Sequence, residues 1–123
     1  MKRAVVALLA VGLVGPARAE PIELGDSKYA SAEAYLAGTW AFGPRRLTFA
    51  PDGGVTYENT EQERTSTGRY EVHGTQVHIS INRSCDKDGT CQTTDDPAVV
   101  DQPFKPVSAD VFQSNSERWQ RQK

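Results

Sequence analysis

The fold class is decided by YLAGTWAFGPRRLTFAPDGGVTYEN (residues 35–59) and by TGRYEVHGTQVHISI (residues 67–81). Apolar side chains alternate with polar ones along both stretches, as they do in strands that bury one face. The turn APDGG, residues 50–54, combines a proline that fixes its own φ with glycines that accept positive φ. These features predict an antiparallel meander whose apolar face is formed by Trp40, Phe42, Leu47, Phe49, Val55, Tyr57, Tyr70, Val72, Val77, Ile79 and Ile81.

Weaker strand patterns follow at residues 98–107, 111–112 and 118–121. The chain as a whole predicts about seven or eight short strands, each with one apolar face to bury. A sheet curled into a small barrel buries those faces and hides its edges, whereas a two-layer sandwich is the rival arrangement. Because the turns before residue 82 are short and consecutive, we expect an all-β fold, a small antiparallel up-and-down β-barrel or half-barrel.

One short helix is expected before the first strand. Ser31 is a favourable N-cap, Glu33 places a negative charge in the first turn, and Gly38 ends the helix. Residues 20–30 hold little to bury and predict a flexible lead-in. Residues 31–123 then form a single domain, because a chain of this length supports one modest core.

Residues 1–19 have the pattern of an export signal. Lys2 and Arg3 precede an apolar run from Ala4 to Val14, and Ala17-Arg18-Ala19 is the small-x-small pattern that signal peptidases cleave. A membrane-spanning helix needs about 20 apolar residues, so this run is too short to be a stable anchor. We therefore expect a chain that begins at Glu20 after cleavage and is periplasmic or secreted.

The charge of the chain argues against a nucleic-acid partner. The full sequence has 14 basic and 16 acidic residues, and three of the basic ones lie in the signal segment. The cleaved chain would carry 11 basic residues against 16 acidic ones, a formal charge of −5. Phosphate binding depends on clustered Lys and Arg, and the only such cluster is near the C-terminus.

The cysteines, Cys85 and Cys91, bracket the stretch SCDKDGTC (residues 84–91). A redox pair is normally a Cys-x-x-Cys motif at a helix start, and these two are further apart. In an oxidising compartment two cysteines of a small exported domain usually join, so we expect a structural disulfide. Asp86, Asp88 and Asp95 also leave a calcium loop open as an interpretation, although the same residues suit a surface turn.

No catalytic motif is present in the sequence, which contains neither Gly-x-Ser-x-Gly nor His-Glu-x-x-His. His73 and His78 flank a predicted turn, but two histidines alone do not make a zinc site. We expect no enzyme activity, no cofactor and no metal, and an enzyme would need a constellation that a linear sequence does not reveal.

Residues 36–81 resemble the small lipocalin-like, or calycin-type, domains of bacterial exported proteins. In that family a short helix leads into a Gly-x-Trp first strand, which Gly38-Thr39-Trp40 matches. A late-strand arginine packs over the tryptophan, and Arg118 or Arg121 is the candidate here. The resemblance implies binding or inhibition rather than catalysis.

Two functions are therefore expected. The first is binding of a small apolar ligand or an envelope component, in a cavity lined by Trp40, Phe49, Tyr57, Tyr70 and Ile79. The second is inhibition of a secreted hydrolase such as a protease, with residues 20–30 or the acidic residues 84–101 entering its active site. In a barrel this short, side chains are expected to fill the interior.

Overall fold

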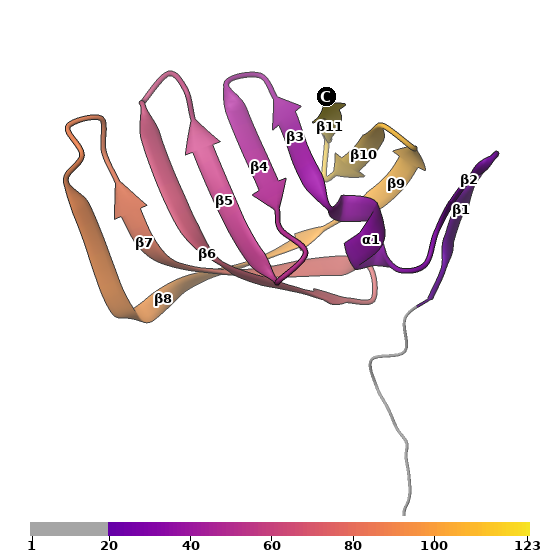
Figure 1. The fold of residues 1–123 in the computed structure, drawn as a ribbon, viewed down its shortest axis with the longest axis horizontal. Helices are drawn as coiled ribbons and strands as arrows, with labels where there is room; N and C mark the ends of the chain where they lie inside the picture. The colour runs from indigo at the N-terminus through magenta and orange to yellow at the C-terminus, as the bar shows by residue number, and fades with distance from the viewer. Residues whose placement is uncertain (1–19) are drawn as a thin grey trace, which may run out of the picture.

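The computed structural model describes residues 20–123, and the predicted signal segment lies outside the described residues. A nine-stranded antiparallel sheet curls into a half-barrel, accompanied by a two-stranded hairpin and one short helix (Figure 1). Helix α1 spans Ala32–Leu36. The strands are β1 (Ile22–Leu24), β2 (Ser27–Tyr29), β3 (Gly38–Phe42), β4 (Arg45–Phe49), β5 (Gly54–Asn59), β6 (Arg64–His73), β7 (Gln76–Cys85), β8 (Cys91–Pro103), β9 (Lys105–Ser108), β10 (Val111–Ser114) and β11 (Glu117–Gln122). No helix within residues 20–123 is long and apolar enough to cross a membrane.

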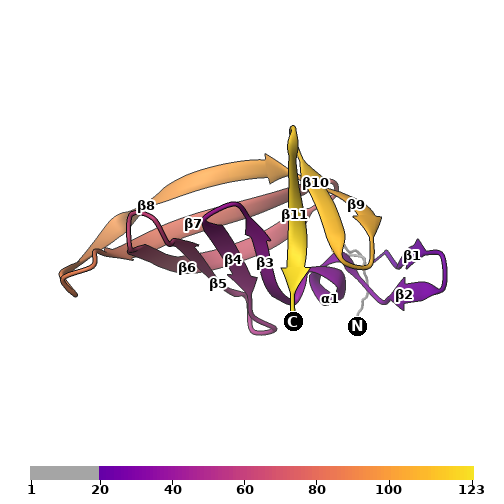
Figure 2. The ribbon, with the colours of Figure 1, turned by 90° about the horizontal axis from the view of Figure 1, so that it is seen from above.

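The strand order of the large sheet is β8-β7-β6-β5-β4-β3-β11-β10-β9. Neighbours in this order follow one another in the chain except where β3 pairs with β11. The two edge strands, β8 and β9, are separated only by Phe104, so the chain connects both ends of the order. Figure 2 shows the curl of the sheet. The prediction of an all-β half-barrel is confirmed, because one curled sheet is present and not two packed layers.

Strand lengths differ from the sequence prediction on the C-terminal side of Asn82. The apolar alternation ends there, yet β7 continues to Cys85 and pairs with β8 from Cys91 onward. The pairing shifts register between Ile81 and Arg83, which is a bulge. Bulges interrupt period-two alternation, and for this reason the sequence pattern alone does not reveal these ends of the strands.

Helix α1 forms as the sequence predicts. The Ser31 hydroxyl accepts a hydrogen bond from the Ala34 N–H at 3.1 Å, and Glu33 lies in the first turn. Gly38, with φ +120°, follows the helix in a backbone conformation that other residues rarely adopt. The helix is short but contributes two fully buried side chains, Tyr35 and Leu36.

Residues 22–29 form the β1–β2 hairpin instead of the flexible lead-in predicted for residues 20–30. Ile22, Leu24 and Tyr29 are half-buried against the core. The Tyr29 ring lies 5.2 Å from that of Tyr35, edge to face. These three side chains are separated by polar residues, so their combined apolar contact is not evident from composition.

The core fills one end of the half-barrel, next to α1. Its members are the buried side chains of Tyr35, Leu36, Trp40, Leu47, Phe49, Val55, Tyr70, Val77, Ile79, Phe104, Phe112 and Trp119. They come from the helix and from strands on both sides of β3 in the sheet, so burying them holds the curl together. We call this the closed end. The opposite end carries the β3–β4, β5–β6 and β7–β8 loops (Figure 1), and we call it the open end.

Candidate ligand site at the open end of the half-barrel

The closed end is fixed by Arg121 and Trp40. The Arg121 guanidinium carbon lies 4.3 Å from the centroid of the Trp40 ring, within the range of a cation–π contact. The same guanidinium donates hydrogen bonds to the backbone carbonyls of Tyr35 at 2.8 Å and Ala37 at 3.0 Å. Of the two arginines expected to cover Trp40, Arg121 does so, whereas Arg118 is exposed.

Tyr35 completes this end. Its hydroxyl lies 2.8 Å from the carbonyl oxygens of both Ser108 and Val111, so its single hydrogen is shared between two acceptors. Burial raises the pKa of Tyr35 to about 12, although the nearby Arg121 opposes the shift. The phenol therefore stays neutral and connects α1 to the loop between β9 and β10.

The five side chains predicted to line a cavity occupy different environments. Trp40, Phe49, Tyr70 and Ile79 belong to the core, with at most 7% of each side chain exposed. Phe49 and Tyr70 pack edge to face at 4.9 Å. Tyr57 alone is half-buried. Tyr57 is therefore the one of the five that is partly open to solvent, whereas the other four are buried in the core.

The inward face changes from apolar to polar toward the open end. Cross-strand partners share a face of the sheet, and one such row runs Leu47, Tyr57, Ser66 and Ser84. The hydroxyls of Ser66 and Ser84 are 2.9 Å apart. The next row toward the open end runs Arg45, Asn59, Arg64. Along each strand, the concave face thus changes from apolar at the closed end to polar at the open end.

An ion pair lies on this polar part of the inward face. Arg45 is paired with Glu117, and the side chains are 29% and 30% exposed. Arg45 lies over the rings of Phe42 and Trp119, with its guanidinium carbon 4.9 Å and 5.3 Å from their centroids. The hydrogen bond to Glu117 is the main cause that raises the pKa of Arg45, with Tyr57 contributing.

We call Phe42, Arg45, Tyr57, Glu117 and Trp119 the open-end cluster. The half-buried rings of Phe42 and Tyr57 offer aromatic surface beside the charge pair, and Trp119 lies buried beneath Arg45. This arrangement suits a molecule with an apolar body and a polar group. Sequence reasoning missed Arg45 and Glu117. The signal was present, because Arg45 precedes Leu47 by two residues and so lies on the same face of its strand.

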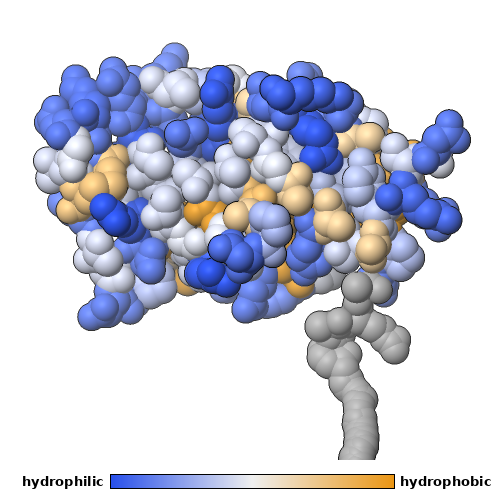
Figure 3. Space-filling model, viewed as in Figure 1, coloured by the Kyte–Doolittle hydropathy of each residue, from blue (hydrophilic) through white to orange (hydrophobic). Residues whose placement is uncertain are grey.

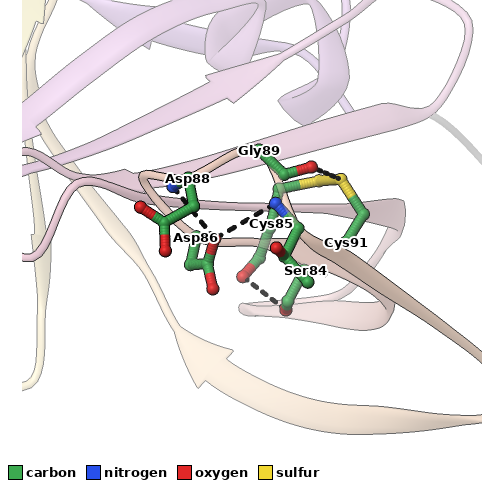
Figure 4. Close-up of a disulfide and its surroundings, with 8 residues drawn as sticks. Ser84, Cys85, Asp86, Asp88, Gly89 and Cys91 are labelled. Carbon is green, nitrogen blue, oxygen red and sulfur yellow. Dashed lines mark hydrogen bonds between the residues drawn. A yellow bond between two sulfur atoms is a disulfide. The ribbon is translucent and has the colours of Figure 1, made fainter.

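The β7–β8 hairpin extends from the open end and carries the disulfide. Cys85 and Cys91 are joined at an S–S distance of 2.07 Å, as predicted (Figure 4). The Asp86 carboxylate accepts hydrogen bonds from the N–H groups of Asp88 at 3.0 Å and Thr90 at 3.1 Å. Asp86 therefore serves the turn, and no group of metal-ligating side chains is found within residues 20–123. A disulfide of this kind indicates an oxidising compartment.

The two histidines lie side by side near the β6–β7 turn. Their rings are stacked with centroids 5.7 Å apart. Each is next to a carboxylate, His73 with Glu71 at 2.9 Å and His78 with Asp101 at 2.7 Å. Both lie on the outward face of the sheet, away from the open-end cluster. Along β6 and β7 they alternate with inward-facing core side chains, and their cross-strand partners, Gln76 and Glu71, face outward with them.

One face of the molecule is mostly hydrophilic, with hydrophobic side chains in small separate patches (Figure 3). No protein-family model matches the chain, and comparisons with curated proteins and with solved structures likewise find no match.

Proposed function

We propose that this protein is an exported, non-catalytic binding module, lipocalin-like, periplasmic or secreted, that binds a small apolar or amphipathic ligand or an envelope component. The observation that carries the proposal is the amphipathic inward face. Its closed end is filled, and at its open end the Phe42 and Tyr57 rings are half-buried beside the partly exposed Arg45–Glu117 pair. The apolar part of a ligand would lie on Tyr57 and Phe42, since Trp119 is buried beneath Arg45, and its polar group would meet Arg45 or Glu117.

The energetic reason lies in the Arg45–Glu117 pair. Each side chain is only partly exposed, so both ions have lost part of their hydration. An anionic group that approaches Arg45 completes its hydrogen bonding while the aromatic rings already hold the guanidinium in place. We therefore expect anionic amphiphiles to bind better than neutral ones of equal size.

A titration with 1-anilinonaphthalene-8-sulfonate tests this proposal. We expect Tyr57→Ala and Arg45→Met to weaken binding of the dye about tenfold each, and Glu117→Gln to strengthen it because Arg45 loses its competing carboxylate. Thr56→Ala, at the neighbouring position on the opposite face of β5, is the matched control and should bind as the unchanged protein does. Equal binding by all four variants would refute the open-end site.

Native mass spectrometry of the protein from its own periplasm identifies the natural ligand. A retained small molecule would support the proposal, and its loss in Tyr57→Ala would place it at the open-end cluster. A small molecule retained equally by Tyr57→Ala and the unchanged chain would contradict the placement at this cluster, and recovery of the unchanged chain without any bound small molecule or envelope component would contradict the proposal.

Inhibition of a secreted hydrolase, such as a protease, is the second candidate function. The observation that favours it is the β7–β8 hairpin, whose tip residues are exposed and whose strands are joined by the disulfide next to the tip. A rigid, exposed loop loses little conformational entropy on entering an active site. Replacing residues 86–90 by Gly and Ser should then abolish inhibition of a secreted protease while leaving dye binding unchanged.

A further inference from the structure

Strand β8 is unusually exposed for a strand of its length. Residues 91–101 are exposed on both faces of the sheet. Within them lies an apolar run, in which Val99 is 52% exposed and Val100 is 45% exposed. Val100 faces inward because its partner Ile79 is in the core, and Val99 faces outward. Long exposed edge strands with apolar residues are sites where another strand can pair.

The backbone of β8 has one free edge. Within residues 20–123, no strand pairs with the edge of β8 that faces away from β7. The Phe104 N–H donates to the Thr75 carbonyl at 2.9 Å, which continues the register that joins Ala98–Pro103 to Ile81–Gln76. Backbone groups along an antiparallel strand alternate between partner and opposite side. Because the Phe104 N–H points to β7, the backbone groups of Gln102, Val100 and Ala98 point to β7 as well. The N–H and C=O groups of Val99 and Asp101, which lie between them, therefore point to the free edge.

Charge determines what this edge can accept. Strand β8 contains three aspartates, Asp95, Asp96 and Asp101, and neither Lys nor Arg, while the turn before it adds Asp86 and Asp88 with one lysine, Lys87. Arg83 lies one strand away, opposite Thr93. Two copies of such an acidic strand would repel one another, since like charges on adjacent strands are destabilising. A strand rich in Lys or Arg would instead meet complementary charge along the same backbone edge.

A groove ends the free edge. It has a volume of about 630 Å³ and is lined by Thr75, Pro103, Phe104, Lys105, Pro106, Gln113 and Asn115. Pro103 has no N–H to donate. A strand that pairs with the free edge therefore finds no backbone donor at this position. A bound segment can place a side chain in the groove where pairing ends.

We propose that the free edge of β8 binds an extended, basic segment of a protein partner by adding it to the sheet as a further strand. Backbone hydrogen bonds to Val99 and Asp101 supply the affinity, and the aspartates select for positive charge. This docking surface is separate from the open-end cluster, so the two sites can be tested independently.

Binding of a short synthetic peptide of alternating Lys and Thr tests the proposal. We expect saturable binding by the unchanged protein, measured by calorimetry, and slowed hydrogen exchange of the Val99 and Asp101 amides. The same peptide with N-methyl groups on alternate residues should bind about tenfold more weakly, since it keeps the charge but lacks the donors on one edge. Equal binding of the two peptides would overturn the proposal, because it would show attraction by charge alone.

Variants of the protein separate the contribution of backbone hydrogen bonds to binding from the contribution of charge. Val99→Pro removes the outward N–H without breaking the β7–β8 pairing and should weaken binding about tenfold, whereas Val99→Thr should not. The double change Asp95→Asn, Asp96→Asn should also weaken binding, and a matched pair of changes at another hairpin, Glu61→Gln and Glu63→Gln, should not. Equal losses in both double variants, or a dimer of the unchanged protein that Val99→Pro dissociates, would contradict the proposed occupant.

Discussion

Trp40 lies where helix, sheet and C-terminal strand meet. Its indole N–H donates to the Leu36 carbonyl at 2.8 Å, Arg121 covers one face of the ring, and Phe112 packs against it at 4.8 Å. The side chain is 0% exposed. Because hydrogen bond, charge and packing are all satisfied at this residue, we assign its main role to stability.

Trp40→Ala should therefore leave the protein barely folded. Removing a buried ring of this size costs about 3 to 5 kcal/mol, out of a total of about 5 to 10 kcal/mol for a domain of this length. Urea unfolding followed by circular dichroism measures the loss, and Trp40→Phe is the control that keeps an aromatic ring. In the unchanged protein, tryptophan emission should be blue-shifted and resistant to acrylamide, because Trp119 is also buried. A stable alanine variant with quenchable emission would refute the assignment.

Tyr35 makes folding stability depend on alkaline pH. Its folded-state pKa is raised to about 12, and a tyrosine in an unfolded chain has a pKa of about 10. Its contribution is fully present below about pH 10 and is lost as pH rises toward about 12, because the unfolded chain releases its phenolic proton first. The loss should reach about 2 to 3 kcal/mol. Tyr35→Phe should show a shallower decline over this range, and an identical decline would contradict the burial of the phenol.

Single residues differed in how far the sequence revealed them. An arginine over Trp40 was expected from the resemblance of Gly38-Thr39-Trp40 to the lipocalin-like pattern, which left Arg118 and Arg121 as alternatives, and the structure places Arg121 there. The role of Tyr35 was not predictable, since its hydroxyl bonds to carbonyls more than 70 positions away in the chain. Such contacts depend on where the curled sheet brings the β9–β10 loop.

At the scale of elements, β6 and β7 approach unusually closely at Gly68. A Cβ placed there would lie 1.8 Å from the Ser80 carbonyl oxygen and 2.9 Å from the Ile81 Cα. The pairing of β6 with β7 shifts register next to this residue, between Thr67 and Gly68. Glycine lets the two backbones come together at the bulge, which bends the long β6–β7 pair around the core.

Gly68→Ala should disrupt this bend. The clash is with backbone atoms, which cannot rotate away, so we expect a loss of more than about 2 kcal/mol in the free energy of unfolding. Gly74→Ala is the control. Gly74 has φ +65° but no neighbouring atom within 4 Å, so only conformational strain of about 1 to 2 kcal/mol applies. Denaturant midpoints of the two variants make the comparison, and equal losses would show that the close approach is unimportant.

The disulfide should act on stability alone. Cys85 and Cys91 close a short loop at the end of the β7–β8 hairpin, so replacing both by Ala should lower the free energy of unfolding by about 2 kcal/mol on the loop-entropy model. The β-type circular dichroism should remain. A double variant that is equally stable but has lost its biological effect would indicate a redox role instead.

Elements were predictable where apolar alternation is regular, from β3 to the middle of β7. The β1–β2 hairpin and the first half of β8 were not, for the same reason. The hairpin buries few side chains, and β8 between Cys91 and Asp101 buries none. Where burial is slight, hydrophobic pattern carries little signal, and only pairing with a neighbouring strand defines the element.

At the scale of the whole molecule, the half-barrel has one packed end and one open end. The sequence predicted the single curled sheet because short consecutive turns favour neighbouring strands. It did not predict that polar side chains would gather on the inward face at the open end. That gathering depends on register, since the rows containing Arg45 and Tyr57 form only when each strand is aligned with the next.

The difference between the packed closed end and the exposed strands should appear as a gradient in the rate of amide hydrogen exchange. Amides of β3, β4 and β11 surround the closed-end core and should exchange only through global unfolding, whereas those of β1, β2 and the exposed part of β8 should open locally. Within β8, Val99 and Asp101 should exchange faster than Ala98 and Val100, whose N–H groups face β7. Native-state exchange measured by NMR in low denaturant resolves each amide. Uniform protection across the sheet would mean that the half-barrel opens as one unit, and that the free edge of β8 is covered in the protein in solution.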